Sequence, residues 1–249
     1  MTTRAEFLAR IRAEMGRAPG LFAAEVSVRP TRPRERLELL RRELSERWRE
    51  DLERFGHEFE RVGGVLHRVS AAAQVPDAIV RIAAERGARR VVAWHGDALG
   101  LDVAAPLAAH GLQASAAPAA EVDADERGRR RALAADADLG VTGVDLAIAE
   151  TGTLVVVSGA GRPRSASLLP PCHVAVFDRD ALVTSLLQAG LALEAWHDGP
   201  PPAGRGASIN FITGPSRTAD IELTLTRGVH GPKEVHAVFV EQGLGPRRG

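Results

Sequence analysis

Residues 146–157 read Leu-Ala-Ile-Ala-Glu-Thr-Gly-Thr-Leu-Val-Val-Val, two short apolar runs on either side of a turn. Runs of this length and β-branched content are typical of buried strands. Outward from this stretch, similar runs alternate with segments whose apolar residues recur every three to four positions, which is the period of a helix. The alternation predicts an α/β fold with a mostly parallel sheet and helices on both of its faces.

The same patterns place the individual elements. Strands are expected at residues 65–69, 91–94, 146–148, 154–157, 174–177, 208–212 and 235–240. Helices are expected at residues 77–86, 103–110, 127–136, 180–190 and 216–223. Glycines directly after two of these runs, Gly87 and Gly111, and Gly190 at the end of a third are typical helix ends.

Three regions are expected along the chain. Residues 1–58 predict an N-terminal helical arm, because Leu37, Leu44 and Leu52 belong to a stripe with helical spacing. This stripe is expected to pack on the body of the protein or on a second subunit. In the second case the chain would form a homo-oligomer. Residues 59–242 form the α/β domain, and residues 243–249, rich in Gly, Pro and Arg, form a flexible tail.

Composition excludes several classes of function. The 249 residues carry 32 basic and 32 acidic side chains, so the excess positive charge of a nucleic-acid-binding protein is absent. No apolar stretch approaches the roughly 20 residues of a membrane span, and the first residues lack a signal-peptide core, so a cytoplasmic location is expected. The single cysteine, Cys172, excludes an iron–sulfur cluster or a structural zinc held by cysteines of one chain. No histidine spacing indicates a metal site.

Two stretches carry candidate functional residues near apolar strands. Glu150 lies at the turn with Thr151 and Gly152, where a carboxylate can serve as base, nucleophile or ligand clamp. The alternative is an ordinary turn whose Glu faces water or holds a loop. The segment 214–220 follows the strand expected at 208–212. If a helix starts there, its backbone N–H groups form an anion site. The residues of this expected anion site are Gly214, Ser216, Arg217, Thr218 and Asp220.

Two further stretches contain glycine and polar residues. His230 and Gly231 lie in a Gly-rich loop before the last strand, and His230 is a candidate acid or base near neutral pH, although a structural role is commoner for such a residue. Residues 158–161, Ser-Gly-Ala-Gly, lack the Gly-x-Ser-x-Gly frame of a nucleophile elbow. Neither a P-loop nor a dinucleotide-binding fingerprint is present, so ATP and NAD lack support.

These stretches in this order resemble one family, the lactate utilization protein C or LUD-domain family. The resemblance rests on Gly140–Thr153, on Ser167–Pro170 with His173, on Gly214–Glu222 and on Gly228–Pro232. It implies an α/β fold similar to the ribose-phosphate isomerase and CoA-transferase group. It also implies a role in L-lactate oxidation to pyruvate beside partner proteins, at least one of which carries iron–sulfur clusters.

Three hypotheses follow for the function. The first is an accessory or subunit of a cytoplasmic L-lactate utilization system that binds no cofactor itself, with iron–sulfur clusters on its partners. Its site would combine Glu150 and His230 as catalytic residues with the anion site, to which Thr151, Gly152 and Gly231 add further ligand-binding residues, and with no metal. The second is a stand-alone transferase or isomerase acting through Glu150 on a CoA-linked or phosphorylated small molecule. The third is a purely structural assembly protein. Whether the chain is itself an enzyme stays open.

Overall fold

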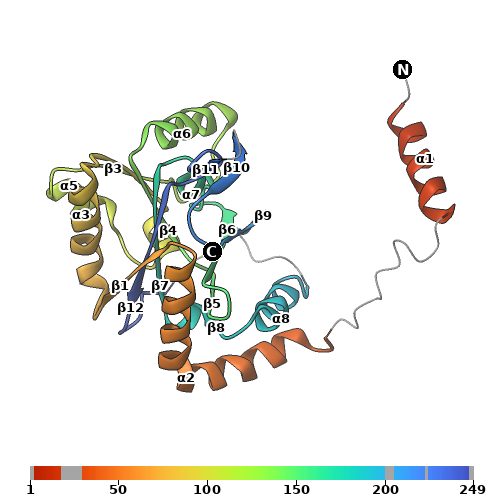
Figure 1. Cartoon of the computed structure of the whole chain (residues 1–249), viewed down its shortest axis with the longest axis horizontal. Helices are drawn as coiled ribbons and strands as arrows, with labels where there is room; N and C mark the ends of the chain where they lie inside the picture. The colour runs from red at the N-terminus through yellow and green to blue at the C-terminus, as the bar shows by residue number, and fades with distance from the viewer. Residues whose placement is uncertain (1–2, 18–29, 200–204, 222–223, 247–249) are drawn as a thin grey trace.

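The fold is built on two sheets that share a core. The computed structural model describes residues 3–17, 30–199, 205–221 and 224–246 (Figure 1). The larger sheet has six parallel strands in the order β1-β12-β7-β4-β2-β3. Their bounds are β1 Val65–Val69, β2 Arg90–Ala93, β3 Gln113–Ala116, β4 Leu139–Gly143, β7 Cys172–Asp178 and β12 Glu234–Val240. The predicted fold class, a mostly parallel sheet, is therefore confirmed.

The larger sheet is buried on both faces. In the central strand β7, Val174 and Val176 pack into one apolar cluster, while Ala175 and Phe177 pack into another on the opposite face. The first cluster also contains Ile79 from α3, and the second contains residues of α2. Because successive side chains of a strand point to opposite faces, a strand covered on both sides is a continuous apolar run.

A second, mixed sheet packs beside the first and was not predicted as a separate layer. It has the strand order β8-β5-β6-β9, and β5–β6 and β6–β9 are antiparallel pairs. The bounds are β5 Leu146–Ile148, β6 Thr153–Gly159, β8 Leu182–Val183 and β9 Arg205–Ile212. A two-stranded antiparallel hairpin follows, with β10 at Arg217–Ile221 and β11 at Thr224–Arg227.

The described residues form eight α-helices, and those from α2 onward pack with the two sheets. Their bounds are α1 Arg4–Arg17, α2 Pro33–Arg61, α3 Val75–Arg86, α4 Gly96–Leu99, α5 Ala104–Ala109, α6 Ala124–Asp136, α7 Ser165–Leu168 and α8 Leu186–Trp196, with short 3-10 turns at Ala72–Gln74 and Arg179–Ala181. Several of them begin with a side-chain cap; for example, Asp123 accepts from the Glu126 N–H at α6, and Ser185 accepts from the Gln188 N–H at α8. Helix α3 ends at Gly87, as expected.

Helix α2 connects the two sheets. Leu37 and Leu44 in its first half pack with α8 and the smaller sheet, whereas Leu52, Phe55 and Phe59 pack on the larger sheet. The predicted stripe thus packs on the body of the protein. Residue 58, the predicted end of the arm, lies inside α2, and the second half of this helix belongs to the core of the α/β domain. Figure 1 shows α1 apart from this body.

One predicted helix is wrong, and another is displaced along the chain. Residues 217–221 form strand β10 in place of the helix expected at 216–223, and residues 222–223 lie outside the described residues. β-Branched residues explain this, because Thr218 pairs with Thr226 and Ile221 pairs with Thr224 across the hairpin. The helix expected at 180–190 begins only at Leu186, after the Ser185 cap, and continues through Gly190.

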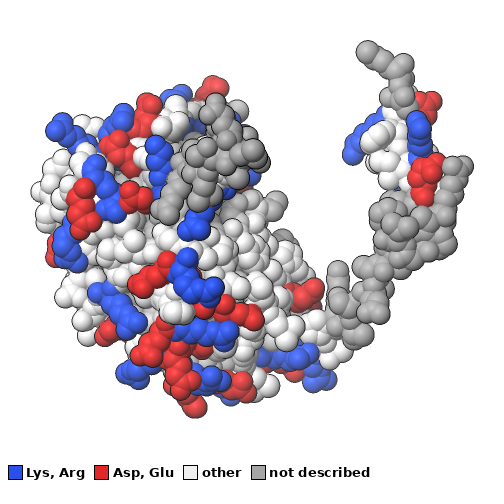
Figure 2. Space-filling view, viewed as in Figure 1, with Lys and Arg blue, Asp and Glu red and all other residues white. Residues whose placement is uncertain are grey.

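Basic and acidic side chains are intermingled on the face shown in Figure 2, as the balanced composition implies. No helix within the described ranges has the length and apolar character to cross a membrane.

The C-terminal residues contact the body of the protein. The backbone N–H groups of Leu244 and Gly245 donate to Asp178 and to the Gly100 carbonyl, so the tail is held as far as Gly245. Residues 247–249 lie outside the described residues.

Gly152 provides a test of how closely α2 packs. Its φ is +59°, and a Cβ there would meet the backbone N of Phe59 in α2. We expect Gly152→Ala to lower the free energy of unfolding by about 2–4 kcal/mol, because backbone strain and overpacking add. Gly87 is the matched control, with φ +62° and open space around a Cβ. Gly87→Ala should cost only about 1 kcal/mol in urea denaturation. Equal losses for the two variants would contradict the close packing.

Candidate functional site

The Glu150 carboxylate holds the start of helix α8. The backbone N–H of Glu150 donates to the Thr184 carbonyl, which places the turn beside the residues that precede α8. Glu150 Oε2 then accepts a hydrogen bond of 2.9 Å from the Leu186 N–H. A carboxylate at this position is favourable because the first N–H groups of a helix lack partners and carry partial positive charge. The exposed Glu150 side chain therefore has a structural contact, which is one of the two roles that the sequence left open for it.

Three threonine hydroxyls link the same turn to the end of β9. The Oγ1 atoms of Thr151 and Thr153 are 2.7 Å apart, and those of Thr153 and Thr213 are 2.8 Å apart. Thr153 is buried, whereas Thr213 is exposed. The turn at Gly152 and the segment that begins at Gly214 thus lie side by side, although about 60 residues separate them in the sequence.

The segment after β9 caps the end of helix α2. Nη2 of Arg217 donates to the carbonyl oxygen of Val62, the residue that ends α2. Gly214 has φ +79°, and a Cβ there would lie 2.6 Å from the same carbonyl oxygen. A guanidinium at this end is favourable, because the last carbonyls of a helix carry partial negative charge. The helix start on which the predicted anion site rested is absent from this described segment, which forms strand β10, and Arg217 binds a carbonyl. Anion binding by these residues stays a prediction.

The second glycine-rich loop packs against this segment. The Ser216 N–H donates to the Pro232 carbonyl over 2.9 Å, and the Gly228 N–H donates to the Ser216 carbonyl over 3.0 Å. A Cβ at Gly231 would come within 3.4 Å of Ser216 Cβ. The His230 side chain, in the same loop between Gly228 and Gly231, is exposed.

The structure thus gathers many of the predicted site residues but not the two proposed catalytic ones. Contacts run from the turn at Thr151 through Thr213 and Ser216 to the loop at Gly231. Thr218 is buried in β10, and Asp220 belongs to the same strand. Glu150 instead contacts α8 and His230 is exposed, and no described interaction joins them.

A buried pair on β4 and β7 was missed by the sequence analysis. Thr142 Oγ1 lies 2.8 Å from His173 Nε2, and both residues are fully buried. Burial, with a smaller effect of His236, lowers the pKa of His173 to about 3, so the ring is neutral. Its Nδ1 has no hydrogen-bond partner within the described part of the chain. The neighbouring Cys172 is buried too, and burial raises the pKa of its thiol to about 12, which leaves it neither a nucleophile nor a thiolate ligand.

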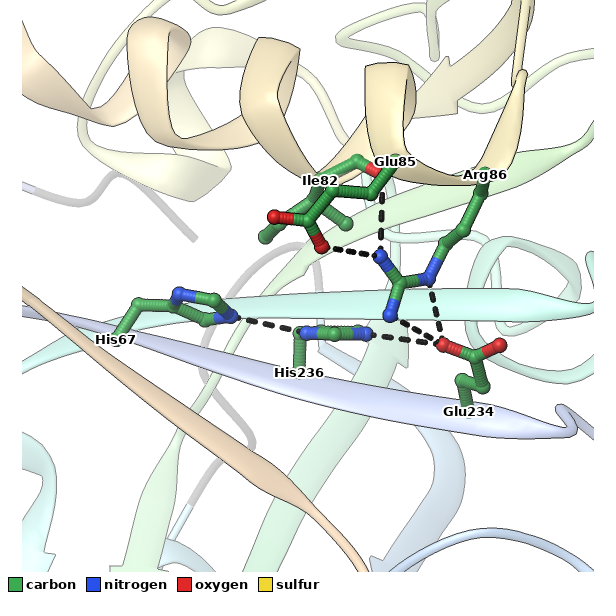
Figure 3. A network of polar contacts seen from close by, with 6 residues as sticks. All are labelled: His67, Ile82, Glu85, Arg86, Glu234 and His236. Carbon is green, nitrogen blue, oxygen red and sulfur yellow. Dashed lines mark hydrogen bonds and ion pairs between the residues drawn. The ribbon is translucent and has the colours of Figure 1, made fainter.

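A second polar network joins β1, β12 and the end of α3 (Figure 3). His67 Nε2 is 2.9 Å from His236 Nδ1, and His236 Nε2 is 3.4 Å from a Glu234 oxygen. Arg86 at the end of α3 binds the same Glu234 oxygen and also Glu85. Burial, and then the charge of Arg86, lower the pKa of His236 to about 4, while burial lowers that of His67. With both rings neutral, His236 donates from Nε2 to Glu234 and accepts from His67.

The described side chains offer no metal centre. Within the described ranges, no three His, Cys, Asp or Glu side chains gather as a metal ion requires. The expectation that this chain binds no cofactor itself stays a prediction.

The sequence pattern of the LUD domain family matches residues 52–240, and the chain belongs to this family. Lactate utilization protein C of Halalkalibacterium halodurans is 43% identical over 110 residues, 43% of this chain and 46% of that protein. The protein of the same name from an Exiguobacterium species is 40% identical over 118 residues, covering 47% of this chain and 50% of the relative. The matches thus span about half the length of these curated relatives.

A solved structure shares the fold. The crystal structure of a DUF162 family protein from Deinococcus radiodurans superimposes with a TM-score of 0.54 at 25% sequence identity. The superposition covers 78% of this chain and 98% of that one.

The buried histidines predict a stability that depends on pH. The unfolded chain protonates these rings near the ordinary histidine pKa of 6.5, whereas folded His236 protonates only near a pKa of about 4. The unfolded state therefore binds more protons between these values, and the stability present above pH 6.5 is lost as the pH falls. From about pH 7 to about pH 5 we expect His236 to contribute a loss of about 2 kcal/mol.

Urea denaturation at the two pH values tests this expectation. His236→Gln should lose less stability on acidification than the wild type, because it removes one of the buried titrating rings. His57→Gln, which changes an exposed histidine, should keep the wild-type pH dependence. An unchanged pH dependence in His236→Gln would show that His236 does not resist protonation in the folded state.

Proposed function

We propose that this chain is an accessory or subunit of a cytoplasmic L-lactate utilization system, which oxidises L-lactate to pyruvate with iron–sulfur partner proteins. The observation that supports this most is its identity of about 40% to proteins named lactate utilization protein C. Membership of the LUD domain family, over most of the α/β body, is consistent with it.

The proposal assigns the redox centres to the partners. Oxidation of lactate to pyruvate releases two electrons and two protons, which an acceptor must take up. A cysteine-held cluster typically requires several thiolates, and this chain has only Cys172, a buried thiol with a raised pKa. The role left to this chain is to bind the partners or a small anion and to position them.

The alternative transferase role has weaker support. It requires the Glu150 carboxylate to attack or bind a substrate, yet one of its oxygens already accepts a hydrogen bond from the start of α8. Formation of a covalent thioester at Glu150 on mixing with an acyl-CoA would favour this alternative.

Iron content tests the assignment of the clusters. The chain purified alone should be colourless and hold no stoichiometric iron, because it lacks the thiolates for a cluster. Tagged and purified from cells grown on L-lactate, it should bring down proteins with the absorption and iron content of iron–sulfur clusters. A brown chromophore bound one-to-one to the isolated chain would contradict the proposal.

Growth on L-lactate tests the function itself. A deletion strain should fail to grow on L-lactate and recover with the wild-type chain. Glu150→Gln keeps an oxygen that can accept from the Leu186 N–H, so stability should change by less than about 0.5 kcal/mol. If the Glu150 carboxylate has a role beyond its contact with α8, this variant should not restore growth. Normal growth at normal protein level would leave Glu150 with only its contact to α8.

A further inference from the structure

A cavity of about 390 Å³ lies where strands β2 and β3 end. Val92, Ala93 and Ala116 line it on the side of the sheet, helix α6 forms one wall, and the loop from Gly159 to Ala166 forms another. The volume falls in the range of about 300–1,000 Å³ that is usual for small-molecule sites. The position is also a usual one, because the cavity lies at the carboxyl ends of the parallel strands β2 and β3, the edge at which open α/β sheets bind ligands.

Helix α6 presents one face to the cavity. Arg127, Arg130, Arg131 and Ala134 line it, and the spacing of three, four and seven residues puts them on one side of a helix. Arg130 is held in place, because its Nη1 donates to Ser115 Oγ and to the Ala116 carbonyl, each over 3.1 Å. Arg129, two residues from Arg127, does not line the cavity and pairs with Glu126.

The charge at the cavity is unbalanced. Glu126 forms ion pairs with both Arg129 and Arg130 and offsets one of their two charges, whereas Arg127, Arg131 and Arg164 have no ion pair within the described residues. Glu121 is the one acidic side chain among the described residues that line the cavity. The rest of the lining is mostly small apolar side chains, with the half-exposed Leu133 at its edge. The lining therefore combines apolar walls with an excess of guanidinium groups, which suit carboxylates and phosphates.

The loop wall is fixed before any ligand binds. The backbones of Gly159 and Arg162 exchange two hydrogen bonds, and the Gly161 carbonyl accepts from the His95 N–H over 2.9 Å. The Arg162 side chain is buried and forms an ion pair of 3.0 Å with the partly buried Asp145. The Trp94 indole also donates to the Pro163 carbonyl over 3.3 Å. A wall held in this way does not lose conformational freedom when a ligand binds, which favours affinity.

We propose that this cavity binds an organic anion whose apolar body fills the space between α6 and the loop, and whose carboxylate, sulfonate or phosphate group meets Arg131 and Arg164. This site is separate from the threonine-linked motif loops, and it does not depend on the proposed role in lactate utilization.

Fluorescence titration with 8-anilinonaphthalene-1-sulfonate tests the site, because this probe has an aromatic body and one anionic group. We expect saturable one-to-one binding that weakens as salt is added. The double variant Arg131→Gln with Arg164→Gln should bind the probe at least about fivefold more weakly, since charge-assisted hydrogen bonds are lost. Arg129→Gln, on the same helix but outside the cavity, should bind as the wild type does.

A second matched pair of variants tests whether the probe binds at the apolar part of the cavity. It also keeps the proposal testable if the arginine double variant fails to fold. Leu133→Glu adds a negative charge at the edge of the cavity and should abolish binding, whereas Ala132→Glu, on the next residue outside it, should leave binding unchanged. Wild-type affinity in the arginine double variant, or equal losses in Leu133→Glu and Ala132→Glu, would overturn the proposal. Because the readout is binding and not growth, failure here leaves the proposed function standing.

Discussion

The close contact between helix α2 and the turn at Gly152 is the constraint on which the rest of the arrangement depends. A side chain at Gly152 would meet the backbone of Phe59, so the helix approaches this turn only because the side chain is missing. That approach brings Phe55 and Phe59 against Phe177 on the larger sheet, while the first half of α2 reaches the smaller sheet. One helix therefore ties both sheets together, and its end defines where the motif loops meet.

Much of what makes the motifs recognisable is packing around that end of α2. Gly214 lets the backbone approach Val62, and Arg217 binds the same carbonyl oxygen. The Ser216 backbone is hydrogen-bonded to the second glycine-rich loop, and the hydroxyls of Thr153 and Thr213 link this segment to the turn at Gly152. A residue pattern can therefore mark a family because it specifies a junction in the fold. This is why these motifs identify the LUD domain family more firmly than they identify a catalytic group.

The sequence predicted the sheet well where local pattern and burial agree. Strand β1 occupies the residues expected, 65–69, and the central strand at 174–177 extends by a few residues only. It failed at 217–221, where Ser and polar residues after a Gly-Pro pair resemble a helix start, but cross-strand pairing of Thr218 and Ile221 decides the structure. Contacts such as Thr142 with His173, or His67 with His236, join strands far apart in sequence, so no local pattern reveals them.

The net charge likewise does not reveal which residues lie close together in the fold. A sum of zero correctly argues against a broad basic surface, yet it says nothing about how charges pair locally. In α6 the acidic residues Asp125 and Glu126 lie in the first turn, and four arginines follow them. Glu126 reaches Arg129 and Arg130, one of them outside the cavity, and so leaves Arg127 and Arg131 uncompensated beside apolar walls. Only the fold, which brings Arg164 to the same cavity from a distant loop, turns this balanced sequence into a locally positive pocket.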